Sequence, residues 1–412
     1  MDTSPMELSW ATVYTEYLYR WTDRNPGKIR YPTAITDAHV MMFVGFGYLL
    51  ILMKSLLNAD FACAGVLISC AAVTELTTPL QLFFMSLLEI ILYSTNNWIG
   101  TVVFQASDVG SSMFVHVFGA YFGLAVSFVL YRRTAYSTDK QSRKDEANGS
   151  INESVSATVG TMFLWLLWPS FNACLAKGDA EQFRAIINTY YSLSASCVTA
   201  FAVVFQNSTL VGGVVIGTSA DMMINIWGAM ILGGLAGAVS IFIDRLSTTK
   251  AIHRIIGIRN AWGVNTLHGI PGIVAGLVGA IVSAAATKED YGFSLYRQFP
   301  ARSPLNSSSE FSKIQYYNLK IDPGRERTAL QQAGFQIAAL IVTLVIAIIG
   351  GLGTGMILVL PFFRPSYEEN DSQSDQLTLV DQLLLSERHL DVIDITNENN
   401  PVVILTENSA ST

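Results

Sequence analysis

The segments DVGSSMFVHVFGAYFG (residues 108–123) and NAWGVNTLHGIPGIVAG (residues 260–276) each place one histidine, His116 or His268, within a long apolar stretch. An ionisable side chain at membrane depth is costly, so it usually faces a cavity or a transport pathway. Each histidine also follows a polar residue by eight positions. A polar–histidine pair that recurs in both halves of the chain predicts a pseudo-symmetric protein built around one central pore.

The composition is that of an integral membrane protein. Of the 412 residues, 51% are hydrophobic and only 14% are charged, against about 25% charged in an ordinary soluble domain. The charged residues avoid the apolar stretches and collect in short loops and towards the two ends of the chain. Basic residues never form a stripe with interleaved aromatics, so a lipid bilayer and not a nucleic acid is the expected surrounding.

The cysteines favour neither a disulfide framework nor a metal site. All of them fall within apolar stretches, where a thiol behaves as a small apolar side chain. Their spacing matches no metal-ligand pattern, and we expect neither a metal nor a cofactor. The residues are Cys63, Cys70, Cys174 and Cys197.

The apolar stretches predict an all-α fold. A transmembrane helix needs about 20 mostly apolar residues, and lipid requires the backbone hydrogen bonds to close within the helix. We expect a polytopic membrane protein, a helical bundle with a pseudo-two-fold inverted repeat and roughly ten transmembrane helices. The expected spans are residues 38–54, 56–75, 80–104, 111–131, 156–176, 185–206, 208–222, 224–244, 263–286 and 333–358.

One stretch fits this pattern poorly. Residues 38–75 are almost continuously apolar, which is too long for one ordinary span and leaves no residues for a turn between two spans. Either one long tilted helix runs through this junction, or a piece of an ancestral chain is absent.

Basic loops orient the chain in the membrane. The segment after Tyr131 and the loop after the 224–244 span are rich in Lys and Arg, so both are expected on the cytoplasmic side. Four expected spans separate them, an even number, so the two assignments agree. The C-terminus is then also cytoplasmic, and the loop at residues 287–332 lies outside. Its Asn306 is a candidate glycosylation site.

The sequence therefore divides into three regions. Residues 1–37 form an N-terminal arm, and residues 38–360 form the transmembrane domain. Residues 361–412 are polar and acidic and are expected to be a flexible cytoplasmic tail. We expect a multi-pass protein of the plasma membrane.

His116 and His268 are the candidate pore residues. An apolar lumen disfavours the charged imidazolium, so both side chains are expected to be neutral at neutral pH. Two neutral imidazoles can share one N–H···N hydrogen bond and keep their outer nitrogens for a small polar guest. The alternative is a pair of unrelated core histidines, each satisfied by a neighbouring helix. Their matched positions in the two halves favour the pore.

Other polar residues flank the histidines. Asp108 precedes the span that carries His116, where a carboxylate can accept N–H bonds from the first helical turn. A cation site is the alternative, but a bare carboxylate in the lumen would trap a cation, which favours a structural role beside the pore. Asn260 can hold the matching hydrogen-bond position without the charge, and Asn265 is assigned to the vestibule with it.

Several motifs carry a family likeness that runs in order from about Tyr31 to Pro365. They are DAHVMMFVGFGYLL (37–50), NADF (58–61), HVFGAYFGL (116–124), LYRR (130–133), FLWLLWPSFN (163–172), INTYYSL (187–193), GGVVIGTSADMM (212–223) and NTLHGIPGI (265–273). In these segments the chain resembles the Rh glycoproteins, a branch of the ammonium transporter (Amt/Mep/Rh) superfamily.

The resemblance implies a homotrimer of helical bundles, each subunit with its own hydrophobic pore for ammonium/ammonia. By motif position, His116 and His268 correspond to twin pore histidines. Phe61 and Phe171 correspond to a stacked gate, and Asp108 shapes the outer vestibule. Ammonium would lose its proton on entry, cross as ammonia down its gradient and regain a proton, with no covalent catalysis. The chain is therefore not expected to be an enzyme.

Three departures from the family pattern stand out. Leu175 replaces a serine that follows the gate phenylalanine by four residues, which points to the Rh branch with a weaker external cation site. Asn260 stands where the second half of the family pattern has an aspartate. Two family helices, one before the DAHVMM segment and one between GFGYLL and NADF, have no counterpart, so ten spans stand in place of twelve.

Other functions stay open beside ammonium transport. The chain could be a structural Rh-type protein that does not transport, or a truncated inactive isoform. Carbon dioxide is an alternative permeant. An unrelated secondary transporter could couple protons through the two histidines, although no ion-coordinating cluster accompanies them. The presence of both histidines favours transport over a purely structural role.

Overall fold

The computed structural model describes residues 53–134, 151–203, 209–247, 262–317 and 319–363. All of these belong to one compact unit, Met1–Phe363. The expected N-terminal arm, residues 38–52 of the expected span at 38–54, Asn260 and the tail beyond Phe363 lie outside the described residues.

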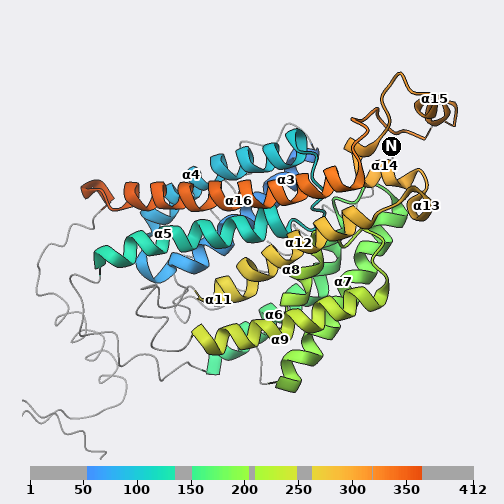
Figure 1. Cartoon of the computed structure of the whole chain (residues 1–412). Helices are drawn as coiled ribbons and strands as arrows, with labels where there is room; N and C mark the ends of the chain where they lie inside the picture. Colours follow the sequence, from blue (N-terminus) through green and yellow to red (C-terminus); the bar gives the residue numbers. More distant parts are fainter. Residues whose placement is uncertain (1–52, 135–150, 204–208, 248–261, 318, 364–412) are drawn as a thin grey trace, which may run out of the picture. The chain divides into compact units, whose positions relative to one another are not determined.

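The described part of the chain is helical and contains no strand. Eight long helices make up most of it (Figure 1). They are α3 (Met53–Val73), α4 (Pro79–Trp98), α5 (Phe118–Thr134), α6 (Ile151–Ala173), α7 (Asp179–Val203), α9 (Ile226–Ser247), α12 (Ile270–Ala285) and α16 (Ala329–Leu358). Shorter helices are α8 (Val211–Gly217), α11 (Trp262–Val264), α13 (Lys288–Tyr291), α14 (Ser294–Gln298) and α15 (Ser309–Tyr316).

Four helical segments among the described residues are long and apolar enough to cross a membrane. They are Ser112–Tyr131, Ile226–Ile243, Asn265–Ala285 and Ala329–Leu358. The expected spans at 56–75, 80–104, 156–176 and 185–206 coincide with α3, α4, α6 and α7. The chain is thus a polytopic all-α membrane protein, as its composition predicts.

The segment at 208–222 differs from the expected full span. Only Val211–Gly217 is helical there, as α8, and all seven of its residues are buried. Two glycines explain the burial, because Gly212 lies against the backbone of Ser192 and Gly213 lies against the ring of Trp168. A side chain at either position would meet these neighbours, so the segment packs as an inner element among the longer helices.

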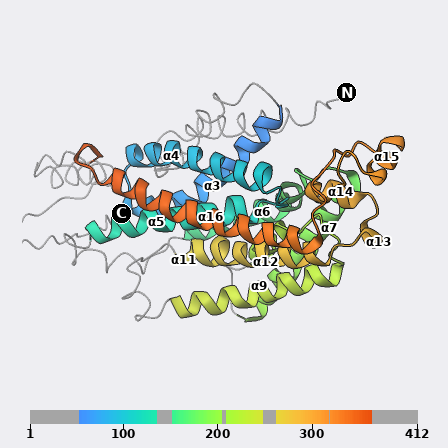
Figure 2. The same cartoon turned by 45° about the horizontal axis from the view of Figure 1, so that its top comes forward.

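The long helices pack closely where small residues meet. Helix α16 packs against α4, α5 and α12, and α3 packs against α5; Figure 2 displays the same arrangement from a second direction. A Cβ atom at Gly119 of α5 would lie 2.6 Å from the Gly65 carbonyl oxygen of α3. A Cβ atom at Gly233 of α9 would overlap with the Ser192 carbonyl oxygen of α7. Such contacts let helix backbones approach each other in lipid.

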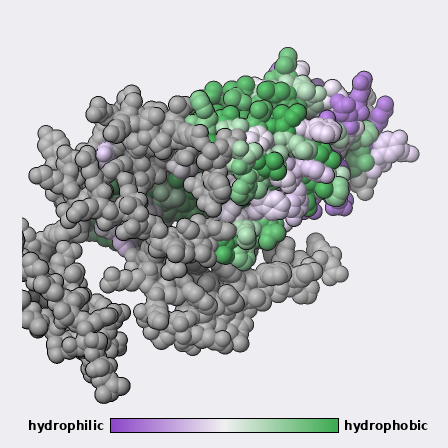
Figure 3. All heavy atoms as spheres, turned by 90° about the horizontal axis from the view of Figure 1, so that it is seen from below, coloured by the Kyte–Doolittle hydropathy of each residue, from purple (hydrophilic) through white to green (hydrophobic). Residues whose placement is uncertain are grey.

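The described surface is apolar along the helices. Large exposed apolar side chains include Leu166, Leu167, Phe242 and Ile281. Polar residues gather at the end of the molecule that carries α13 to α15, seen at the right of Figure 3. An apolar belt of this kind fits a helical bundle surrounded by lipid.

A glycine pair tests the close packing of α7 and α9. Gly233→Ala is expected to lower the free energy of unfolding by about 1–3 kcal/mol, because the added methyl group overpacks the contact with Ser192. Gly334→Ala, on α16, is the control, since nothing lies within 4 Å of a Cβ atom built there. The control should be neutral or stabilising, because alanine is the better helix former. Thermal unfolding of the two purified variants in detergent measures the difference, and equal midpoints would contradict the packing argument.

Candidate functional site

The two candidate pore histidines lie on matching local structures. His116 is on the π-helical turn Ser112–Val117, directly before α5. His268 is on the π-helical turn Asn265–Gly269, directly before α12. One-turn π-helical segments within helices occur frequently at functional sites, because the wider turn redirects a side chain.

The structure brings these two histidines into direct contact. Their Nδ1 atoms are 2.9 Å apart, and their ring planes are inclined by only 4° with centroids 5.0 Å apart. One ring must donate its Nδ1 hydrogen and the other must accept it, so at least one Nδ1 is unprotonated in this geometry. His116 is 4% exposed. Its buried Nε2 has no hydrogen-bond partner in the described part of the chain, and is available to a small polar guest.

Trp168 forms a further wall beside His116. Its ring is nearly parallel to the imidazole, with 11° between the planes and 5.6 Å between the centroids. This residue was not expected at the site from the sequence. Its position three residues before Phe171 is the available signal, because residues three apart share one face of a helix.

Phe61 and Phe171 meet as a pair of rings. Their centroids are 4.6 Å apart, and the planes are tilted by 33°. The ring of Phe171 is also 6.3 Å from that of His116. The four rings of Phe61, Phe171, Trp168 and His116 therefore form one continuous aromatic group, which His268 extends.

Asp108 caps the π-helical turn that carries His116. Its carboxylate accepts hydrogen bonds from the backbone N–H groups of Met113 and Phe114, each at 3.0 Å. The Thr218 hydroxyl donates to the other carboxylate oxygen at 2.6 Å. Three donors thus surround a carboxylate that is 8% exposed. Thr218 was not expected from the sequence, since it lies 110 positions away.

Further contacts fasten this turn to α8. The Gly110 N–H donates to the Gly217 carbonyl oxygen at 2.9 Å, and the Ser112 hydroxyl donates to the Val214 carbonyl oxygen at 2.6 Å. Ser111 between them has a positive φ of 53°, a conformation uncommon in residues other than glycine. The segment that leads to His116 is therefore hydrogen-bonded to α8 at two points.

The remaining candidate residues are spread more widely. Asn265 begins the π-helical turn of His268, and its side-chain oxygen is buried without a partner among the described residues. Asn306 is exposed on the loop before α15. Leu175 is half-buried and packs with the apolar residues around Phe61 and Val109. Asn260 lies outside the described residues.

Glu89 is a buried carboxylate at the junction of α3, α4 and α5. Its side chain is fully buried and accepts a hydrogen bond from the Ser69 hydroxyl, whose oxygen is also 2.8 Å from the Gly119 carbonyl oxygen. These contacts lie where Gly65 and Gly119 bring α3 and α5 together. We find no contact between Glu89 and the histidine pair in the described residues.

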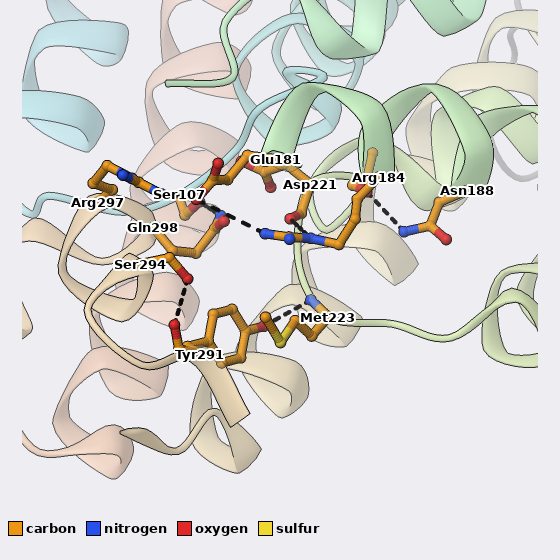
Figure 4. A network of polar contacts seen from close by, with 11 residues as sticks. Ser107, Glu181, Arg184, Asn188, Asp221, Met223, Tyr291, Ser294, Arg297 and Gln298 are labelled. Atoms are coloured by element: carbon orange, nitrogen blue, oxygen red, sulfur yellow. Dashed lines mark hydrogen bonds and ion pairs between the residues drawn. The ribbon is translucent and has the colours of Figure 1, made fainter. Parts of the chain in front are cut away.

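A polar network joins the loop at residues 287–332 to the bundle (Figure 4). Arg297 of α14 lies 3.2 Å from the Glu181 carboxylate of α7, and Arg184 donates to the Asp221 carbonyl oxygen at 2.9 Å. The Gln298 side chain donates to the Ser107 hydroxyl at 3.2 Å. Ser107 is the neighbour of Asp108, so this network reaches the capped turn.

The loop at residues 287–332 has its own small core, with Phe299 and Ile314 fully buried in it. Beside that core, Lys288 pairs with the Glu310 carboxylate, and the Tyr296 hydroxyl donates to the same carboxylate at 2.6 Å. The hydrogen bond from Lys288, and then that from Tyr296, hold the pKa of the Glu310 carboxyl below its ordinary value. These contacts hold the short helices α13, α14 and α15 of this loop together.

The sequence profile of the Ammonium Transporter Family matches residues 27–379. Ammonium transporter Rh type B of Xenopus tropicalis is 37% identical over 389 residues, which covers 81% of this chain and 78% of that protein. Ammonium transporter Rh type C of Pongo abelii is 34% identical over 406 residues, covering 85% and 81%. The chain therefore belongs to the ammonium transporter family.

Solved structures share the fold at lower identity. Nitrosomonas europaea Rh50 superposes with a TM-score of 0.52 at 22% identity, covering 87% of this chain and 89% of that chain. Candida albicans Mep2 superposes with a TM-score of 0.56 at 17% identity, covering 87% and 74%. At these identities the likeness is one of fold alone.

A threonine pair tests the role of Thr218 in holding Asp108. Thr218→Val removes a hydroxyl that donates to a buried carboxylate, so the free energy of unfolding should fall by about 1–3 kcal/mol. Thr199→Val is the matched control, because among the described residues the Thr199 hydroxyl bonds only to the Ala195 carbonyl oxygen one turn back in its own helix. Thermal unfolding in detergent compares the two variants. A loss at Thr199 as large as that at Thr218 would contradict the assigned role.

Proposed function

We propose that this chain transports ammonium across a membrane by passing neutral ammonia alongside the hydrogen-bonded pair His116 and His268. The single observation that carries the proposal is the 2.9 Å contact between their Nδ1 atoms, with a buried and unpartnered Nε2 on His116. Family membership supports it, because relatives 37% and 34% identical are named ammonium transporters.

Desolvation explains why the neutral form would cross. A bare ammonium ion entering an apolar lumen loses its hydration, which costs far more than losing the hydrogen bonds of a neutral molecule. Ammonia needs only one or two partners, and an imidazole nitrogen can provide one. The paired rings of Phe61 and Phe171 would exclude bulk water and hydrated ions at the entrance.

The proposed sequence of events is passive. Ammonium gives up its proton at the outer gate, ammonia crosses the apolar passage, and the molecule regains a proton on the other side. The proton lost on entry returns to the outer solution, so no net charge crosses. Asp108 acts in this scheme as a structural residue of the outer vestibule, because three donors already occupy its carboxylate. Asn260 and Asn265 would take the corresponding place in the second half.

The proposal extends to the setting of the protein. We place it in the plasma membrane as a multi-pass homotrimer with a cytoplasmic C-terminus, on the basis of its basic loops and its family. The transmembrane domain would be residues 38–360, between the arm at 1–37 and the tail at 361–412. Asn306 would then face outside, where its exposure on the loop before α15 suits a glycan.

A histidine substitution tests the passage directly. In proteoliposomes that carry the full chain, an ammonium gradient should change the internal pH faster than in empty vesicles. His268→Ala is expected to slow this change at least about tenfold, since losing a hydrogen bond of about 1.4 kcal/mol from the passage step is a factor of ten in rate. His389→Ala, in the segment assigned to the tail, is the matched control and should conduct like the unaltered chain.

Two outcomes of this flux assay would overturn the proposal. Unaltered protein that is no faster than empty vesicles would favour the structural, non-transporting alternative. Unchanged flux in His268→Ala would remove the histidine pair from the mechanism. A carbon dioxide gradient applied to the same vesicles separates the two permeants, and we expect acidification at the empty-vesicle rate.

A sequon substitution tests the orientation. Asn306→Gln should abolish any shift in gel mobility that glycosidase treatment causes in protein made by a secretory cell. Asn152→Gln, in a segment expected on the cytoplasmic side, should leave that shift unchanged. A glycan that depends on Asn152 would reverse the orientation proposed here.

A further inference from the structure

The backbone between α4 and Asp108 is held in an unfavourable shape. Gln105 has a φ of 49°, in the left-handed region that few residues other than glycine adopt. Such a conformation persists only where the surrounding structure enforces it, and these positions cluster at functional sites. Residues 104–108 connect the π-helical turn Ile99–Val103 to the capped turn of His116. What enforces their shape therefore bears on the site.

Side chains from α16 and from Arg327, two residues before that helix, supply that constraint. Gln336 makes two hydrogen bonds to the backbone of one residue, accepting from the Ser107 N–H and donating to the Ser107 carbonyl oxygen, each at 2.7 Å. Gln332 donates to the Gln105 carbonyl oxygen at 3.0 Å, and Arg327 donates to the Phe104 carbonyl oxygen. We call Arg327, Gln332 and Gln336 the α16 polar ladder.

The polar ladder is buried and itself fixed in place. Gln332 and Gln336 are fully buried, and Arg327 is 7% exposed. Positions 332 and 336 are one helical turn apart, so both side chains project from the same face of α16. The Arg327 guanidinium also lies 3.6 Å from the centroid of the Phe335 ring, where a cation is attracted to the face of the ring.

Gln336 is the member of the polar ladder that lies nearest the site. Ser107 directly precedes Asp108, whose carboxylate caps the turn that carries His116. A shift of the Ser107 backbone would move the Asp108 carboxylate away from the N–H groups of Met113 and Phe114, which donate hydrogen bonds to it. A glutamine amide can both donate to and accept from the backbone of one residue in this way, whereas an ionised carboxylate has no hydrogen to donate.

We propose that Gln336 is a positioning residue for transport, which sets the Asp108 carboxylate and, through it, the turn of His116. This inference rests on the proposed function, since Asp108 shapes the outer vestibule there. Gln332 and Arg327 support the same segment further from Asp108, through the carbonyl oxygens of Gln105 and Phe104. A helix late in the chain thereby fixes the entrance that the first half of the chain forms.

The test combines flux with hydrogen exchange on the full chain. Gln336→Leu keeps the approximate shape of the side chain and removes both hydrogen bonds to Ser107. We expect ammonia flux to fall roughly tenfold, the loss for one hydrogen bond in the rate-limiting step, and the amides of Met113 and Phe114 to exchange faster. Gln331→Leu is the matched control, because Gln331 is exposed and, within the described part of the chain, bonds only in the cap of α16. It should change neither readout.

A double-mutant cycle distinguishes positioning from general stability. If Gln336 acts through Asp108, then Gln336→Leu should reduce flux in the unaltered chain but have no further effect in an Asp108→Asn background. Equal fold reductions in both backgrounds would overturn the positioning role and leave the proposed function standing. Gln336→Met, which keeps the length of the side chain and can neither donate nor accept these hydrogen bonds, should behave like Gln336→Leu. It replaces Gln336→Leu in the cycle if the leucine variant does not fold.

The remaining outcomes are also decisive. Unchanged exchange at Met113 and Phe114 in the Gln336 variant would overturn the inference. Unchanged flux in Asp108→Asn alone would overturn it as well, together with the vestibule role of Asp108, while transport by the histidine pair would still stand. If the unaltered chain does not transport ammonia, the proposed function is wrong. The exchange measurement would then still report whether Gln336 holds the capped turn.

Discussion

The contact between His116 and His268 is the constraint on which the rest of the structure depends. The two residues are 152 positions apart, yet their Nδ1 atoms are 2.9 Å apart. A buried imidazole needs partners for its polar atoms, because an unpaired polar group in an apolar environment is costly. The pairing satisfies one nitrogen of each ring. It also requires the two halves of the chain to pack in a fixed register, since a displacement of one ångström would break the bond.

The surroundings of His116 maintain that register. Asp108 caps the turn that carries His116, and Trp168 stacks on the imidazole. Carbonyl oxygens of α8 accept hydrogen bonds from the Gly110 N–H and the Ser112 hydroxyl. Each of these contacts comes from a different segment of the chain. Helices that touch through glycine, such as α3 and α5, bring these segments close enough to bond. The site is therefore a consequence of helix packing more than of any one helix.

The same contacts decide the electrostatic character of the site. The Asp108 carboxylate is enclosed by the N–H groups of Met113 and Phe114 and by the Thr218 hydroxyl, so it does not stand bare beside the aromatic group. The rings of Trp168 and Phe171 lie beside His116. An environment of this kind favours a neutral guest over an ion, because aromatic rings replace little of the hydration that an ion loses.

The sequence by itself determined the membrane setting and the all-helical fold, and it singled out His116 and His268 as candidate pore residues. It could do so because the length of an apolar run and a polar–histidine repeat are local patterns. Family motifs singled out Phe61 and Phe171, which no local pattern distinguishes among 22 phenylalanines. The full span expected at 208–222 is instead the short buried helix α8. Only the tertiary structure decided that Thr218 and Gln336 hold the approach to His116. Their hydrogen-bond partners lie 110 and 229 positions away, and a partner at that distance is chosen by how the helices pack.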